Sequence, residues 1–141
     1  MEFPENCIRG IPNRDFLTPG RLVATHLFYF SDDARDDGWI EQSINWQDDD
    51  QAIEFTLRQR KEDGQLQFRA GVAIVPRVEL DRIRERSIHG SALSYERRAL
   101  PDNPYHGNML LRYDTDKAVM RQIAATLALY AQHIPAYGAE P

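Results

Sequence analysis

The side chains best suited to catalysis or binding lie in one short segment, Asn103-Pro104-Tyr105-His106-Gly107-Asn108. A histidine can act as a general base or as a metal ligand near neutral pH, and its neighbours here supply hydrogen-bond donors, acceptors and an aromatic face. The residue before a proline avoids helical angles, and a glycine lets the backbone bend, so residues 100–107 are predicted to form a loop. His106 is therefore our candidate catalytic residue, as a general base or a metal ligand.

The same segment also has a structural interpretation. In a turn, asparagine side chains hydrogen-bond the backbone, Tyr105 packs against the core, and His106 bonds locally. One histidine without a defined acid or nucleophile beside it does not make a mechanism. Both interpretations stay open on the sequence alone.

A second segment, Ser43-Ile44-Asn45-Trp46, combines polar and aromatic residues just before the acidic run Asp48-Asp49-Asp50. A concave site in which Asn45, His89 and His106 converge would favour catalysis. The candidate binding residues from both segments and from the rest of the chain are Asn45, Trp46, His89, Asn103, Tyr105 and Asn108.

Several common chemistries have no counterpart in the sequence. It contains no GxxxxGK[ST] or GxGxxG phosphate loop, no HExxH zinc pair and no GxSxG nucleophile elbow. Cys7 is the only cysteine, which excludes an intramolecular disulfide and a thiolate zinc cluster. These motifs therefore predict no metal site, and the cofactor is unknown.

The charge and hydropathy of the chain limit its partners. The formal net charge is −5, which argues against sequence-independent binding of nucleic acid, because such binding needs surplus lysine and arginine. No apolar run approaches the roughly 18 residues that a membrane span requires. The first ten residues do not have the pattern of a secretory signal peptide. These features predict a cytoplasmic protein without a membrane segment, whose partner is another protein or a second copy of itself.

The pattern of apolar residues predicts a single domain over residues 1–141, with an irregular lead-in at 1–20 and a loose tail at 134–141. Strands are expected at residues 21–30, 39–46, 66–75, 92–98 and 109–113, with the first two forming an antiparallel pair. Helices are expected at residues 79–87 and from Thr115 or Asp116 to about 132.

Residues 48–64 have two competing interpretations. Ile53, Phe55 and Leu57 alternate as in a strand, and Asp63-Gly64 could form a hairpin turn. As a helix, the stretch has acidic residues at its start and basic residues near its end, which complements the helix dipole. We favour the helix. The predicted fold is therefore α+β: a mostly antiparallel sheet covered by the C-terminal helix and one or two shorter ones.

Four stretches resemble a pattern found in small uncharacterised bacterial proteins. They are Cys7-Ile8-Arg9-Gly10-Ile11-Pro12, Phe16-Leu17-Thr18-Pro19-Gly20-Arg21, Ser43-Ile44-Asn45-Trp46 and Asn103-Pro104-Tyr105-His106. The resemblance spans most of the chain at low density and implies a compact, standalone protein. It transfers no site residues, because no activity accompanies the pattern.

Two functions of different class are consistent with the sequence. The first is a non-catalytic binding or accessory protein that acts through contact with another protein, in keeping with its size and acidic charge. The second is a small hydrolase or nuclease that uses His106 with nearby aspartate or asparagine residues.

Overall fold

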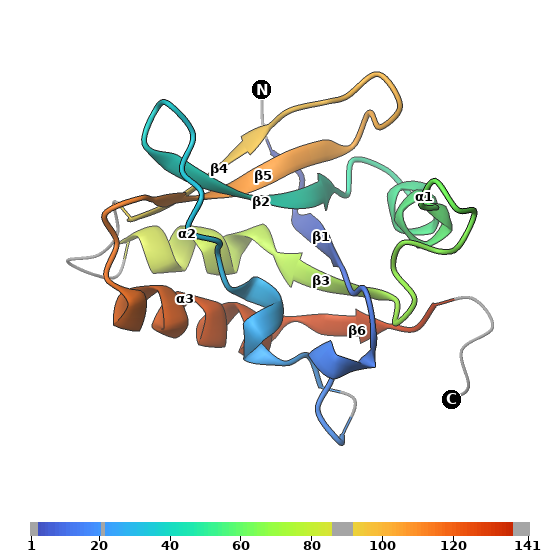
Figure 1. Ribbon diagram of the computed structural model, residues 1–141, viewed down its shortest axis with the longest axis horizontal. Coiled ribbons are helices and arrows are strands. Elements are labelled where there is room, and N and C mark those ends of the chain that lie inside the picture. The colour runs from blue at the N-terminus through green and yellow to red at the C-terminus, as the bar shows by residue number, and fades with distance from the viewer. Residues whose placement is uncertain (1–2, 21, 86–91, 137–141) are drawn as a thin grey trace.

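An antiparallel sheet of six strands forms the centre of the protein in the computed structural model, which describes residues 3–20, 22–85 and 92–136 (Figure 1). The strands, in the spatial order β4-β5-β2-β1-β3-β6, are β1 (Asn6–Gly10), β2 (Trp39–Trp46), β3 (Val72–Pro76), β4 (Leu93–Arg97), β5 (His106–Arg112) and β6 (Gln132–Ile134). The helices are α1 (Ala52–Arg58), α2 (Arg77–Glu85) and α3 (Lys117–Tyr130), with short 3-10 helices at Arg14–Phe16 and Thr25–Phe28. The chain is therefore α+β, which confirms the predicted fold class.

The main hydrophobic core lies between one face of the sheet and helices α2 and α3. Leu80 of α2 and Leu127 of α3 are fully buried there against Trp46, Val75 and Met109 of the strands. In a strand, alternate residues point to opposite faces, so these strand positions define the core face of the sheet. The predicted amphipathic helix is confirmed as α3, and the side chain of Asp116 caps it by accepting a hydrogen bond from the Ala118 amide.

The opposite face of the sheet is covered only in part, by α1. Ala52 and Leu57 of this helix pack against Ile8, Val72 and Ile74, which forms a second, smaller apolar cluster. The cluster lies over β1 and β3 and leaves much of the same face of β2, β5 and β4 without a helix (Figure 1). We call this second side the polar face of the sheet, because Ser43, Asn45, His106, Asn108 and Glu96 point to it.

Our preference for a helix within residues 48–64 is confirmed, since α1 occupies Ala52–Arg58. The competing hairpin also has a counterpart. An antiparallel bridge joins Arg60 to Leu66, and Gly64 has a positive φ of 86° in the turn between them. The helix ends at Arg58, two residues before the bridge begins at Arg60, so the helical pattern and the hairpin turn belong to separate features.

The predicted irregular lead-in is wrong for residues 6–10, because they form β1, which lies between β2 and β3 in the middle of the sheet. The predicted strand at 21–30 is also wrong. Its described residues include a 3-10 helix in which the adjacent Leu27 and Phe28 are both buried, which an alternating strand does not allow. As a result, β2 pairs with β5 and β1 rather than with the preceding segment.

The remaining differences concern the ends of elements. Strand β3 begins at Val72 rather than at residue 66, because Gly71 takes a positive φ of 98° just before it. Helix α3 ends at Tyr130, and the chain continues directly into the short edge strand β6, which the sequence does not predict. Among the described residues, no helix is long and apolar enough to cross a membrane.

Candidate functional site

Antiparallel pairing of β2 with β5 brings together the two segments that the sequence singles out. Asn45 lies opposite His106, and Ser43 lies opposite Asn108, at neighbouring positions of the polar face. Directly opposed residues in such a ladder are close enough for their side chains to interact. His106 is thus the first residue of β5 rather than part of the loop, and its orientation is set by the strand.

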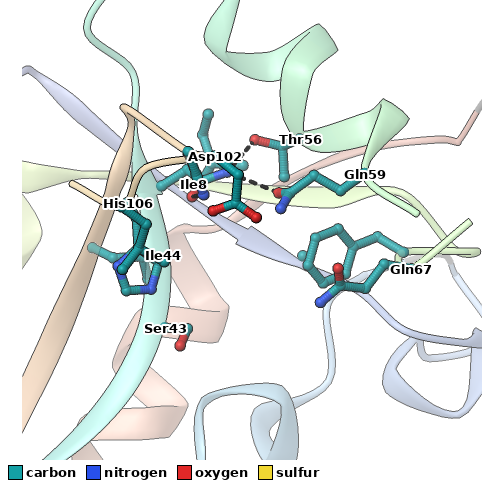
Figure 2. Close-up of a pocket in the computed structure, with 13 residues that line it drawn as sticks. Ile8, Ser43, Ile44, Thr56, Gln59, Gln67, Asp102 and His106 are labelled. Atoms are coloured by element: carbon teal, nitrogen blue, oxygen red, sulfur yellow. Dashed lines mark hydrogen bonds between the residues drawn. The ribbon is translucent and has the colours of Figure 1, made fainter. Parts of the chain in front are cut away.

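A pocket of about 230 Å³ opens on this face, between β2 and β5 on one side and the segment after α1 on the other (Figure 2). His106 and Ser43 lie on one side of it, and Gln59 and Gln67 lie on the other. Its volume is below the range of roughly 300–1,000 Å³ that is typical of sites for drug-sized ligands. The pocket therefore suits a single side chain or a small molecule of comparable size.

The apolar part of the wall depends on a close approach between Phe68 and Gly10. Both residues line the pocket, and a Cβ atom placed on Gly10 would lie 2.2 Å from the Phe68 ring. Only a glycine leaves space for the ring at this point of β1. Gly10 therefore fixes where the aromatic wall stands.

Four of the polar lining residues form a hydrogen-bond network centred on Asn45. The Nδ2 atom of Asn45 donates to Thr56 Oγ1 at 2.7 Å and to Gln59 Oε1 at 3.1 Å. The Oδ1 atom of Asn45 accepts from Asn103 Nδ2 at 2.8 Å, and Thr56 donates to the carbonyl oxygen of Ala52 within α1. Asn45, Thr56 and Asn103 are almost fully buried. The network ties β2, α1 and the turn before β5 into one rigid floor.

Asn103 also shapes the turn in which it lies. Its Oδ1 atom accepts from the Tyr105 amide at 3.0 Å, and its backbone exchanges two hydrogen bonds with Leu100. This is the hydrogen-bonded asparagine turn that the structural interpretation predicts. Asn103 and Asn45 thus position other groups, and the hydrogen-bonding capacity that a ligand could use must come from elsewhere in the pocket.

His106 is held in a defined tautomer. Its Nδ1 atom lies 2.9 Å from the carbonyl oxygen of Arg98, and a carbonyl can only accept, so Nδ1 carries the proton. The lone pair of the neutral ring is then on Nε2, which has no hydrogen-bond partner among the described residues. Nε2 can accept a hydrogen bond or a proton from a group that enters the pocket.

Three further side chains of the lining are also without a partner in the described part of the chain. These are the hydroxyl of Ser43, the amide of Gln67 and the carboxylate of Asp102, and all three residues are exposed to solvent. The sequence analysis did not select Gln67 or Asp102. Their residue types are common on surfaces, and only the position of their segments in the fold brings them to one pocket.

Tyr105, Trp46 and Asn108, which the sequence also selects, lie outside the pocket lining. Tyr105 donates from its hydroxyl to both carboxylate oxygens of Asp49, at 2.9 and 3.1 Å, and this contact raises the pKa of Tyr105. Its ring meets Phe55 of α1 edge to face. His89 lies outside the described residues.

Trp46 lies in the hydrophobic core and not at the binding site that the sequence predicts. The side chain is fully buried on the core face, and its Nε1 atom donates to the carbonyl oxygen of Glu96 at 3.0 Å. The indole passes directly over Gly107, where a Cβ atom would lie 2.3 Å from Nε1. Gly107 is thus needed for a close approach in the strand and not for the bend that the sequence predicts.

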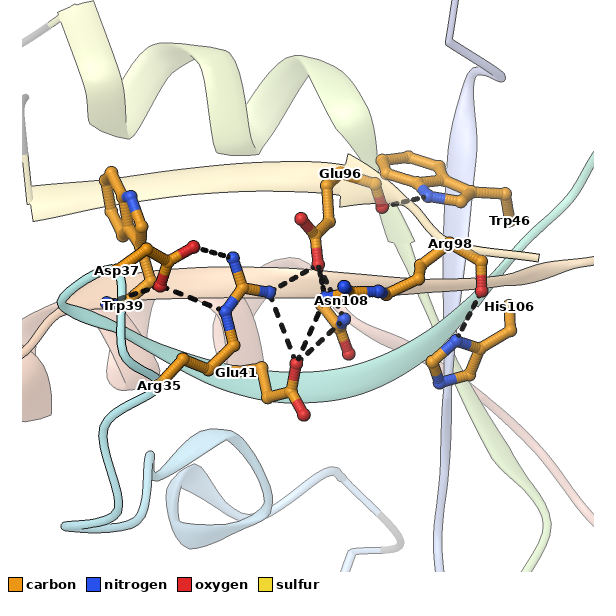
Figure 3. A network of polar contacts seen from close by, with 9 residues as sticks. All are labelled: Arg35, Asp37, Trp39, Glu41, Trp46, Glu96, Arg98, His106 and Asn108. Carbon is orange, nitrogen blue, oxygen red and sulfur yellow. Dashed lines mark hydrogen bonds and ion pairs between the residues drawn. The ribbon is translucent and has the colours of Figure 1, made fainter. Parts of the chain in front are cut away.

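Asn108 belongs to a separate ionic cluster on the polar face, next to the pocket along β2 and β5 (Figure 3). We define the ionic cluster as Arg35, Asp37, Glu41, Glu96, Arg98 and Asn108. Arg35 pairs with Asp37, with Glu41 at 3.3 Å and with Glu96 at 2.7 Å. Arg98 lies 3.6 Å from Glu96. The cluster fastens the segment before β2 onto the sheet.

The buried side chain of Asn108 lies at the centre of this cluster. Its Nδ2 atom donates to Glu96 at 2.8 Å and to Glu41 at 3.2 Å, and the residue is only 1% exposed. Partial burial alone would raise the pKa of Glu96, but the hydrogen bond from Asn108 and the pairing with Arg35 lower it. Pairing with Arg35 also lowers the pKa of Asp37. The cluster therefore favours the ionised forms of Glu96 and Asp37.

Comparisons with protein-family models, with curated proteins and with solved structures found no match for this chain. Within the described residues, no group of three or more histidine, cysteine, aspartate and glutamate side chains is arranged to hold a metal ion. The geometry of the pocket is thus the basis for a functional proposal.

Proposed function

We propose that this protein is a binding or accessory protein without catalytic activity, which acts by contact with another protein at the pocket on its polar face. The observation that carries the proposal is that the polar side chains of the lining fall into two sets. One set forms the floor network centred on Asn45, and the other set has unused hydrogen-bonding capacity at the opening.

This division is typical of a binding site. A few polar groups on a rigid support fix the orientation of a ligand, and apolar walls exclude water around it. The floor binds three separate elements together, so the groups at the opening stand on a preorganised frame. A protein ligand then loses little free energy to ordering of the site.

The proposal is tested by position-dependent cross-linking in cells that express the protein naturally. Gln67 lines the pocket, and Gln65 is an exposed glutamine of the same segment that does not. A photoreactive phenylalanine analogue at position 67 should give a discrete adduct with one partner, and the same analogue at position 65 should not. Ser43→Trp, which fills the pocket from β2, should remove the adduct. Equal adducts from both positions, or none at position 67, would overturn the proposal.

The alternative function, a small hydrolase or nuclease centred on His106, is favoured by one specific observation. The hydrogen bond from Nδ1 to the Arg98 carbonyl directs the lone pair of Nε2 away from the backbone, as in many catalytic histidines that serve as a base. Among the described residues, however, no hydrogen bond joins His106 to an acid or to a nucleophile. The Ser43 hydroxyl lies on the same side of the pocket but makes no bond to the ring (Figure 2).

His106→Asn separates the two functions. The asparagine amide can keep the bond to the Arg98 carbonyl, whereas the base at Nε2 is lost. A hydrolase would lose its turnover of ester or nucleic-acid substrates in this variant while its thermal unfolding midpoint stayed nearly constant. A binding protein has no turnover to lose, and its cross-link at position 67 should persist. If His106→Ala and His106→Asn both unfold the domain, the role of His106 is structural.

A further inference from the structure

We infer that the pocket takes the guanidinium group of an arginine side chain from the partner protein. This inference rests on the proposed function and names the chemistry of the contact. It follows from the charge, the hydrogen-bonding character and the shape of the lining, which are argued in turn.

The charge of the pocket favours a cation. Among the described lining residues, Asp102 carries the fixed charge, and its carboxylate has no ion-pair partner within the described chain. The nearby arginines are already occupied. Arg98 pairs with the ionic cluster, and Arg9 donates to the backbone carbonyl oxygens of Leu27 and Ser43 without lining the pocket. An anion would therefore meet an unpaired carboxylate and no lysine or arginine among the described lining residues.

The unused groups of the pocket mostly accept hydrogen bonds. The ionised carboxylate of Asp102 offers only acceptor atoms, and Nε2 of His106 offers a lone pair when the ring is neutral. The carbonyl of Gln67 is a third acceptor on the opposite side (Figure 2). A guest with several donors that spread in one plane can reach acceptors on different walls at once. A guanidinium has five N–H donors in a fixed fork and no acceptor, whereas an ammonium is a compact point charge.

The shape of the lining supports the same guest. Phe68 forms an aromatic wall held in place by its contact with Gly10, and guanidinium groups stack on aromatic rings. Ile8 and Leu100 add apolar surface along which the methylene groups of an arginine can lie. The volume of about 230 Å³ admits one such side chain and excludes a larger folded element.

The test uses the full chain and two small probes of nearly identical shape. Acetyl-arginine amide carries the guanidinium, and acetyl-citrulline amide replaces it with a neutral urea group. Amide signals of the ¹⁵N-labelled protein are followed during titration with each probe. The arginine probe should shift the signals of Ser43, Gln59, Gln67 and His106, and the citrulline probe should bind at least about fivefold more weakly, because charge-assisted hydrogen bonds are the stronger ones.

A matched pair of variants checks the source of this preference. Asp102→Asn keeps the shape of the side chain and removes its charge, so it should reduce the affinity for the arginine probe toward that for citrulline. Asp36→Asn removes the charge of another exposed aspartate, before the start of β2, and should leave the affinity unchanged. Equal binding of the two probes, an unchanged affinity in Asp102→Asn, or preferential binding of inorganic phosphate would each overturn the inference.

Failure of this inference is distinguishable from failure of the proposed function. If the position-67 adduct forms but neither the arginine probe nor Asp102→Asn has the expected effect, the protein contact stands and its guanidinium chemistry is wrong. If no position-67 adduct forms, the proposed function itself is wrong, whatever the probes show.

Discussion

The substitution Asn108→Asp is the sharpest test of the ionic cluster, because it changes one buried atom group from donor to anion at nearly constant shape. In the native protein, Nδ2 of Asn108 donates to Glu96 and to Glu41. An aspartate at this position places a third carboxylate where a donor stood. We therefore expect a large loss of stability with no change of fold.

The magnitude follows from the two hydrogen bonds and from the repulsion that replaces them. A hydrogen bond to a charged group contributes about 1.5–3 kcal/mol, and the longer contact to the more exposed Glu41 belongs at or below the low end. Like charges at 4 Å repel by about 4 kcal/mol at an effective dielectric constant near 20, and protonation of the new carboxyl limits this cost. The free energy of unfolding at pH 7 should thus fall by about 3–5 kcal/mol.

The stability difference between the native protein and Asn108→Asp should depend on pH. The lowered pKa of Glu96 means that its contribution to native stability is present above its unfolded pKa and is lost as the pH falls through the folded one. In Asn108→Asp, the crowded new carboxyl has a raised pKa, so its protonation relieves the repulsion in acid. The difference in unfolding free energy between native protein and variant should therefore narrow as the pH falls from 7 toward about 4.

Urea unfolding followed by tryptophan fluorescence measures these free energies, since Trp46 is fully buried. Asn108→Leu is the control, because it removes the donor without adding a charge and should cost less, about 1–3 kcal/mol. The reasoning is refuted if Asn108→Asp is as stable as the native protein at pH 7. It is also refuted if the two variants cost the same at every pH, since no electrostatic term would then remain.

Two further predictions concern the core face. Gly107→Ala places a methyl group against the indole of Trp46 and the carbonyl of Glu96, so it should break the hydrogen bond between them. We expect the unfolding free energy, measured by urea titration, to fall by about 1–3 kcal/mol. An unchanged unfolding midpoint would contradict this close approach. Burial raises the pKa of the Cys7 thiol to about 12, so iodoacetamide at pH 8 should label Cys7 only as fast as the protein unfolds. Intact-mass spectrometry over time measures the labelling. Rapid labelling without denaturant would place the thiol at the surface.

The sequence predicts best those elements whose pattern is local. Strand β2 has the bounds expected for it, and helix α3 begins after the expected cap at Asp116. Each carries its own periodicity over enough residues to be recognised. The sequence also selects two distant segments, around Asn45 and His106, and the structure brings both to the wall of one pocket.

Strand β1 could not be predicted, because its pattern is not local. Its five residues lie close to prolines, and their burial does not alternate: Cys7, Ile8 and Gly10 are buried, whereas Asn6 and Arg9 are half-buried. They are buried because both faces of the sheet are covered at this strand: Cys7 packs in the main core, and Ile8 packs in the cluster under α1. Strand β6 is too short to show a pattern of its own: it has three residues, follows α3 directly and pairs with β3 at the edge of the sheet. Pairing partners distant in the sequence determine both strands.

Strand alternation sends the end of the segment Asn103–Asn108 to opposite faces of the sheet. Residues 106 and 108 point to the polar face, where one lines the pocket and the other holds the ionic cluster, while Gly107 faces the core beneath Trp46. The side chains of Asn103 and Asn45 bind each other in the floor of the pocket and leave ligand contacts to other residues. The site that we propose is thus one face of the β2–β5 pair, completed by residues such as Gln67 and Asp102 from other segments. A substitution on this face should alter binding, and one on the core side should alter stability first.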